Sequence, residues 1–154
     1  MSVSTAPAAI TQLIAEILKQ SAAASTDNFT FGIRQGEPQH DWPVDDGMYI
    51  SQVSRSIQRT EMRGFSVGGM REDFVLQVNI GVFRGGDNVT DVEARAWALI
   101  NAIETAVSSN RSLNAAVIEA WAESSTVSSE WDPEAKTAGR RAIATVGVHC
   151  YSFI

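Results

Sequence analysis

The sequence of 154 residues contains one cysteine, Cys150, and two histidines. A single cysteine cannot form an intramolecular disulfide, which is consistent with folding in a reducing compartment. Basic residues are also few, because 12 lysines and arginines stand against 18 acidic residues and give a formal net charge of −6. A surface of this sign repels nucleic acid as a whole. The composition therefore argues against a protein that grips DNA.

Long hydrophobic runs are absent as well. No segment approaches the ~20 apolar residues of a membrane-spanning helix, so no membrane association is expected. The N-terminus has no basic stretch ahead of an apolar run, which argues against a secretory signal. Hydrophobic residues make up 44% of the chain and charged residues 19%, as in ordinary globular proteins. We expect one domain over residues 1–154, with residues 1–7 frayed.

Apolar residues recur at helical spacing in two segments. The first covers residues 8–24, and the second begins near Thr90, where a T-x-x-E pattern with Glu93 predicts a capping box. The residues expected on the buried face of the first helix are Ile10, Leu13, Ile14, Ile17 and Leu18. Those of the second helix are Val92, Ala96, Leu99, Ile100, Ile103 and Val107.

Period-two alternation predicts five strands, and the clearest signal lies in residues 72–83. There Phe74, Leu76, Val78, Ile80 and Val82 alternate with other residues. The other expected strands cover residues 27–35, 48–59, 116–124 and 140–154. In the second of these, Tyr49, Val53 and Ile57 are expected on one side. Polar segments at 36–47 and 125–139 are expected to be loops.

The expected fold class is α+β, with two layers. A mainly antiparallel sheet of four to five hairpin-linked strands would carry both helices on one face. Residues 60–71 would form the tip of a long protruding hairpin, made adaptable by Gly64, Gly68 and Gly69.

Three chemical sites can be considered, and each has a simpler explanation. His40, Asp41, Asp45 and Asp46 suggest cation ligands, but their spacing matches no calcium-loop pattern, so a solvated loop is expected. Adjacent His149 and Cys150 would point to opposite faces of a strand and cannot form a dyad, so Cys150 is expected to be buried. The glycine-rich connection lacks the Gly-Lys-Ser/Thr ending of a phosphate loop. We therefore predict no catalytic, cofactor or metal site.

The hairpin is instead a candidate interface. Its arginines either protect an exposed edge from aggregation or dock on an acidic partner. Val75 and Phe83, on the otherwise polar side of their strand, favour docking. Trp97 is expected to pack inside, whereas Trp42 and Trp131, beside prolines in loops, are expected to anchor loops or fill an interface. The candidate interface residues are Arg55, Arg59, Arg63, Phe65, Met70, Arg71, Trp42 and Trp131.

The order of elements and several residue blocks resemble the tail terminator, or tail completion, proteins of long-tailed bacteriophages. The similarity covers about residue 8 to the end of the chain. The blocks that carry it are MYISQV at 48–53, REDF at 71–74, EARAW at 93–97, Ile103-Glu104, and NRSLN at 110–114.

The resemblance implies a structural protein, not an enzyme, that needs no cofactor. It implies a homo-oligomeric ring, expected to be hexameric, that caps the head-proximal end of the tail tube. The ring would end tube polymerisation, contact the tail tube protein and the head-tail connector or stopper protein, and reside in the virion neck after assembly in the host cytoplasm. Genomic DNA would pass through its lumen without specific binding, which suits the acidic charge.

Two alternatives remain open. The protein could be another connector or stopper of the neck, which only the identity of its partners would separate from a terminator. It could also be a small ligand-binding or enzymatic α+β domain with chemistry near His40, Asp45, Asp46 or Cys150. Against the enzyme, no set of nucleophile, base and orienting residue can be assembled from the sequence. We expect residues 60–71 to become ordered on ring closure or on contact with the tube.

Overall fold

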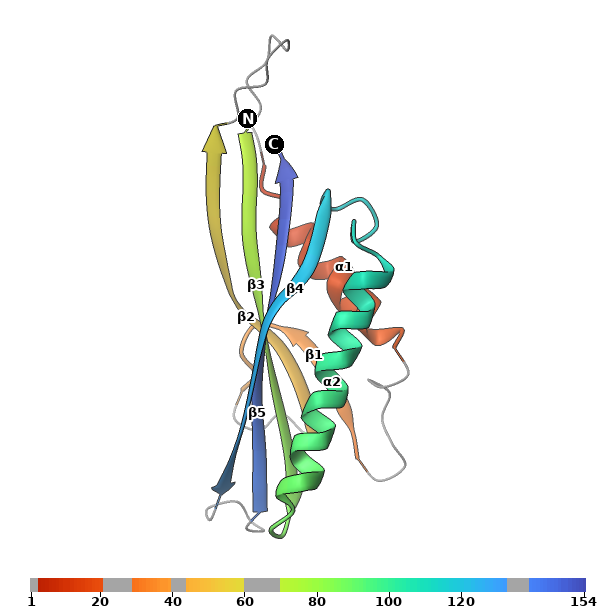
Figure 1. Ribbon diagram of the computed structural model, residues 1–154, viewed down its shortest axis with the longest axis vertical. Helices are drawn as coiled ribbons and strands as arrows, with labels where there is room; N and C mark the ends of the chain where they lie inside the picture. Colours follow the sequence, from red (N-terminus) through yellow and green to blue (C-terminus); the bar gives the residue numbers. More distant parts are fainter. Residues whose placement is uncertain (1–2, 21–28, 40–43, 60–69, 133–138) are drawn as a thin grey trace.

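The computed structural model describes residues 3–20, 29–39, 44–59, 70–132 and 139–154. Both helices lie on one side of a single five-stranded sheet with strand order β1-β2-β3-β5-β4 (Figure 1). This arrangement confirms the predicted α+β fold and the predicted order of elements. The elements are α1 (Ala6–Leu18), β1 (Phe31–Gln35), β2 (Asp46–Arg59), β3 (Met70–Gly85), α2 (Val89–Ser109), β4 (Glu119–Asp132) and β5 (Gly139–Phe153).

The core lies between the helices and one face of the sheet. All six apolar residues predicted for the inner face of α2 are buried, as are the five alternating residues predicted for β3. In α1, Ile10, Leu13 and Ile17 are buried, but Leu18 is exposed at the last turn. Burial of aliphatic side chains stabilises the fold by about 1.5–3 kcal/mol each, so these matched faces hold the two layers together.

The predicted capping box does not form. Asn88 is the N-cap residue of α2, no side chain caps the helix, and Thr90 already lies in the first turn. Glu93 instead accepts a hydrogen bond from the Ser129 hydroxyl, with 3.0 Å between the oxygens. The carboxylate therefore links the helix to β4, and Asp91 is the acidic residue that complements the helix dipole.

The first strand pair departs from the predicted hairpin connectivity. β1 runs parallel to β2, with Phe31 opposite Asp46 and Gln35 opposite Ile50. The other three strand pairs are antiparallel, so the sheet is mainly antiparallel as expected. The start of β2 is fixed to the chain before β1 by Asp45, whose carboxylate accepts hydrogen bonds from the Thr30 backbone N–H and hydroxyl at 2.9 and 3.1 Å.

A β-bulge in β2 changes which side chains share a face. The register to β3 shifts between Ile50 and Gln52, so the alternation is interrupted by one residue. Tyr49 therefore lies on the side of the sheet opposite the helices, whereas Val53 and Ile57 lie on the helix side. The prediction that these three residues share a face is wrong, because it assumed an unbroken period of two.

The segment predicted as a loop at 125–139 is largely a strand. β4 continues to Asp132 and pairs with β5 along its length, with Asp132 opposite Gly139. Its serines and threonine gave no hydrophobic alternation, because β4 is the last strand of the sheet and buries few of its side chains. β4 is a strand because its backbone pairs with β5, and the local sequence pattern does not show this pairing.

The connection from α2 to β4 contains three successive non-glycine residues with left-handed backbone. The φ angles are 46° at Leu113, 55° at Asn114 and 66° at Ala115. The Asn110 side chain holds this turn, because its oxygen accepts the Asn114 backbone N–H at 3.1 Å and its amide donates to Asn114 Oδ1 at 2.7 Å. The Asn114 amide in turn donates to Gln12 Oε1 at 2.7 Å, so the turn also positions α1.

Candidate functional site

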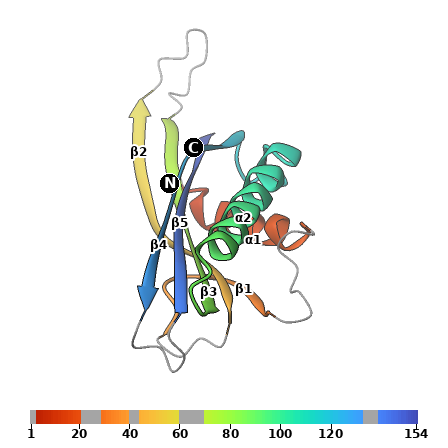
Figure 2. The same ribbon diagram turned by 60° about the horizontal axis from the view of Figure 1, so that its bottom comes forward.

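The side of the sheet opposite the helices, which we call the open face, is covered by no described helix (Figure 2). Several large apolar side chains point to this face, which is unusual for a solvated sheet. Val75 and Phe83 are half-buried among neighbouring strands, and Trp121, Ile143 and Phe153 are exposed. The open face is therefore a candidate contact surface.

An ionic group lies in the upper half of the open face. His149 of β5 lies between two carboxylates, with Nε2 3.0 Å from Asp73 Oδ1 and Nδ1 3.2 Å from Glu123 Oε2. Arg71 donates two hydrogen bonds to Asp73, at 2.8 and 3.0 Å. Bonding from Arg71 is the main cause that lowers the pKa of Asp73, with a further contribution from His149, against the opposing effect of burial.

Aromatic rings extend this group along the same face. The Trp121 and His149 rings are stacked, with centroids 4.4 Å apart and an interplanar angle of 9°. Tyr151 meets Trp121 edge-on, and the Arg71 guanidinium lies 4.3 Å from the Tyr151 ring centroid. We call Arg71, Asp73, Trp121, Glu123, His149 and Tyr151 the His149 cluster. The cluster combines aromatic rings with paired charges at the surface, which suits contact with another surface.

The outer part of the β2–β3 hairpin is anchored by a buried carboxylate. Glu72 is fully buried and accepts hydrogen bonds from the Thr5 backbone N–H and hydroxyl, both at 2.9 Å, and from the Arg55 guanidinium. Burial raises its pKa, but the bonds from Thr5, Ser4 and Arg55 outweigh this effect, and the net pKa is lowered. The prediction that residues 1–7 fray is wrong for Thr5, Ala6 and Pro7, since α1 begins at Ala6.

The candidate interface residues differ in their exposure and in their partners. Arg55 and Arg71 are bound by Glu72 and Asp73 of their own chain, so they do not stand ready as free docking cations. Arg59 and Met70 are exposed at the end of the hairpin. Trp131 is exposed too, but in strand β4 rather than in a loop, with the Arg140 guanidinium 5.7 Å from its ring centroid. Arg63, Phe65 and Trp42 lie outside the described residues.

The acidic residues that suggested a metal site are occupied by protein groups. Asp46 lies in β2 and is 1% exposed. Its carboxylate accepts hydrogen bonds from Arg84 at 2.6 and 3.2 Å and from Arg95 at 2.7 Å. Asp45 is held by Thr30, while His40 and Asp41 lie outside the described residues. Among the residues that the structure describes, no group of three or more His, Cys, Asp and Glu residues is placed to hold a metal ion.

Cys150 and His149 lie on opposite faces of β5, as predicted. The thiol is buried in the core, and desolvation raises its pKa to about 12. A thiol so strongly protonated is a poor nucleophile. The prediction that Cys150 is buried is confirmed.

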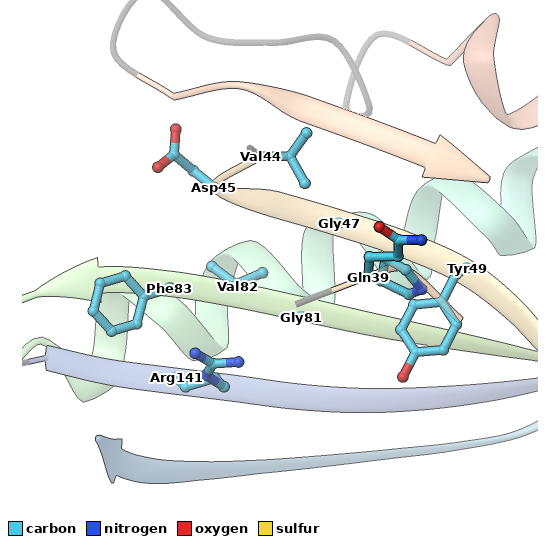
Figure 3. Close-up of a pocket in the computed structure, with 10 residues that line it drawn as sticks. Gln39, Val44, Asp45, Gly47, Tyr49, Gly81, Val82, Phe83 and Arg141 are labelled. Atoms are coloured by element: carbon cyan, nitrogen blue, oxygen red, sulfur yellow. The ribbon is translucent and has the colours of Figure 1, made fainter. Parts of the chain in front are cut away.

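The lower half of the open face contains a pocket of about 290 Å³ (Figure 3). Gly47 and Gly81 lie opposite each other in neighbouring strands, and two missing side chains leave a shallow floor. Tyr49, Phe83 and Arg141 stand around it, and the loop residues at its rim are Pro38, Gln39, Val44 and Asp45. The lining is mixed, because Gln39, Asp45 and Arg141 stand beside apolar residues.

Two features escaped prediction from the sequence. Trp97 was expected to pack inside, but it is 52% exposed on the outer side of α2, one residue beyond buried Ala96. The His149 cluster joins residues from three strands, and only the apolar residues on the polar side of β3 hinted at it.

No helix among the described residues is long and apolar enough to cross a membrane. No protein-family model matches the chain, and no curated protein matches it.

Proposed function

We propose that this protein is a structural subunit of a phage tail, of the tail terminator type. In this role it forms a ring, expected to be hexameric, on the head-proximal end of the tail tube. The ring ends tube polymerisation and offers a surface to the connector or stopper of the head. The observation that carries the proposal is the exposed end of the β2–β3 hairpin, which extends beyond the helical layer (Figure 1).

The hairpin has the properties of an assembly arm. Every residue of β2 from 51 to 59 is exposed, including Val53 and Ile57, the latter at 45%. Val53 and Ile57 leave 38% and 45% of their surface exposed within their own chain, so contact with a second surface would bury the rest and stabilise them. The arm is nevertheless fastened to the rest of the fold, because Glu72, opposite Ile57, is bonded to Arg55 and to Thr5 at the start of α1.

The chemistry of the described residues supports a scaffold. The buried acids are paired with arginine or lysine side chains or bonded by Thr5, and the buried thiol is protonated. These groups stabilise the fold and leave no reactive constellation around the pocket. The net charge of −6 suits a lumen through which DNA must slide.

A truncation of the hairpin tests the proposal. Arg59 and Met70 are paired at the end of the ladder, so an Asn-Gly turn in place of residues 60–69 can close the hairpin with two residues. We expect this variant to keep its melting temperature within a few degrees. In cells infected by a virus that lacks the gene, it should fail to restore finished tails in negative-stain images. Normal tails with the truncated protein would contradict the assembly role of the hairpin.

The pocket gives the ligand-binding alternative its own test. Gly81→Val places a side chain where an added Cβ meets no atom within 4 Å, so the fold should tolerate it while the floor is covered. A ligand-binding protein would show a ligand-dependent rise in melting temperature that this variant loses. The terminator proposal expects no such rise with a panel of nucleotides and metal ions. Partner capture then separates terminator from stopper, since only the terminator binds tube ends.

A further inference from the structure

We infer that a second copy of this protein covers the open face, so that the free protein is a two-fold dimer with its two sheets packed face to face. In this dimer the His149 cluster of each copy lies over the pocket of the other copy. The inference goes beyond the proposed function, since it concerns a contact between free copies and does not depend on a tail. The observations behind it are the area of the open face, its paired charges and its shape.

The open face is large enough for a stable dimer. Strands β2, β3, β5 and β4 lie side by side, and β3 pairs with β5 from Arg71 to Gly85. With about 4.8 Å between strands and about 3.4 Å per residue, this face measures roughly 19 by 48 Å, or on the order of 900 Å². A standard protein–protein interface buries about 800 Å² on each partner. Packing of two such faces therefore covers the area that a specific dimer needs.

The contact would bury apolar side chains that their own chain leaves in water. Trp121, Ile143 and Phe153 are 37%, 40% and 43% exposed on this face, and Val75 is half-buried. Removal of such side chains from water is the main driving force of association. The middle of the face offers hydroxyl and amide groups that can form hydrogen bonds across the contact, and they belong to Gln52, Gln77, Asn79, Thr126 and Thr145.

The charges of the His149 cluster do not oppose this contact, because they are already paired within the chain. Asp73 accepts two hydrogen bonds from Arg71 and lies 3.0 Å from Nε2 of His149. Glu123 lies 3.2 Å from the other ring nitrogen, Nδ1. An unpaired charge is costly to remove from water, whereas charges that are bonded to each other are less so. The pairing therefore lowers the main penalty for covering this part of the face.

The shape of the open face identifies the partner as a second copy. Its upper half carries aromatic rings, because Trp121 is stacked on His149 and meets Tyr151 edge-on. Its lower half is hollowed at the pocket, where Gly47 and Gly81 have no side chains (Figure 3). Tryptophan and tyrosine rings have an apolar body and a polar tip, which suits the mixed lining of the pocket. A two-fold contact needs one patch that fits itself, and rings at one end with a hollow at the other meet this requirement.

A two-fold axis that lies between the two sheets and runs across the strands produces this fit. It reverses the strand direction of one sheet relative to the other, so the upper half of each open face meets the lower half of the other. The cluster lies mainly on β4 and β5 and the pocket mainly on β2 and β3, so the strands of the two sheets must cross at an angle. Packed sheets normally cross at about 30°. Exposed Glu119 then comes near Arg141 beside the pocket of the other copy, so opposite charges meet.

Cross-linking of single-cysteine variants tests the geometry. Gln77 lies in β3 between the rows of the cluster and those of the pocket, close to the axis, so the two copies of this residue face each other. We expect Gln77→Cys to give a covalent dimer with a short bismaleimide at micromolar concentration. The native Cys150 is buried and does not compete for the reagent. Thr105→Cys is the matched control, because this residue is exposed on α2 and should give no covalent dimer.

Sedimentation velocity measures the strength of the contact. We expect the wild type to be a dimer at micromolar concentration. Trp121→Ala removes a ring that enters the pocket, and Gly81→Phe fills the pocket, where an added Cβ meets no atom within 4 Å. Each should raise the dissociation constant of the dimer by about tenfold or more. Trp97→Ala is the control, since it removes an exposed tryptophan from the outer side of α2 and should dimerise like the wild type. Circular dichroism of each variant checks that the fold is intact.

Several outcomes would overturn the inference. A wild type that sediments only as a monomer or only as a larger ring would exclude the dimer. Dimers that form equally well with Trp121→Ala, or equal cross-linking at positions 77 and 105, would place the contact elsewhere. The proposed function is judged separately by tail completion. Finished tails from a protein that never dimerises would refute only the dimer, whereas a cross-linked dimer of a protein that completes no tails would support the dimer and refute the function.

Discussion

Removing the carboxylate of Asp46 should destabilise the protein strongly. Asp46 opens β2 and joins three elements, because it is bonded to Arg84 at the end of β3 and to Arg95 in α2. The ion pairs therefore fasten the lower end of the sheet to the helical layer. Asp46→Ala removes the buried carboxylate to which both guanidinium groups are bonded.

The magnitude follows from burial. The side chain of Asp46 is 1% exposed, and those of Arg84 and Arg95 are 11% and 15% exposed. Breaking a buried ion pair by removing one partner costs about 3–5 kcal/mol, because an uncompensated charge remains in the interior. Arg84 keeps an acceptor in the Phe83 carbonyl at 2.8 Å and lies 3.6 Å from the Phe29 ring centroid. We therefore expect the lower end, about 3 kcal/mol.

Urea denaturation followed by tryptophan fluorescence and circular dichroism measures this loss. With a slope of about 2 kcal/mol per molar, the midpoint should fall by about 1.5 M. Asp87→Ala is the matched control, since Asp87 makes an exposed ion pair with Arg140 and should cost at most about 1 kcal/mol. A cost below 1 kcal/mol for Asp46→Ala would refute the reasoning.

Three further predictions concern Glu72 of the hairpin, the left-handed turn and the buried thiol. Because the pKa of Glu72 is lowered in the folded protein, its contribution to stability is present above its ordinary pKa of 4.5 and is lost as pH falls through the lower folded value. The difference in unfolding free energy between wild type and Glu72→Gln should therefore shrink below about pH 4.5, and a constant difference in acid titrations would count against it. Ala115→Gly should raise stability by roughly 0.5–1 kcal/mol in urea denaturation, because it relieves a left-handed alanine but adds freedom to the unfolded chain. The control Ala94→Gly, inside α2, should instead cost about 1 kcal/mol, and equal losses would contradict the strain argument. Cys150 should react with a thiol reagent only on unfolding, and rapid labelling of the native protein would show that the thiol is accessible.

Sequence pattern was sufficient where one element buries a complete face against the core. α2 and β3 are such elements, and all the apolar residues predicted for their inner faces are buried, because periods of 3.6 and 2 map directly onto one side of a helix or strand. Cys150 belongs to this class as well. Ala102, Ala106 and Glu72 are buried on the inner faces of α2 and β3 too and were not predicted. The pattern failed for β4, whose serines and threonine form a strand only because β5 lies beside it.

The candidate site was likewise predicted only in part from the sequence. The sequence indicated the hairpin and its arginines, but Arg55 and Arg71 were expected to face a partner and instead bind acids of their own chain. His149, Asp73 and Trp121 come from three different strands, and no local spacing relates them. Their contact depends on the register of the sheet.

By itself the sequence determined the layers of this protein, since the periodicity of apolar residues specifies which faces must be removed from water. Only the tertiary structure decided the parallel start of the sheet, the bulge that moves Tyr49 to the open face, and the burial of Asp46 and Glu72. These features depend on contacts between residues far apart in the chain. A buried carboxylate is stable only when its partners arrive from other elements, so its sequence neighbours cannot reveal it.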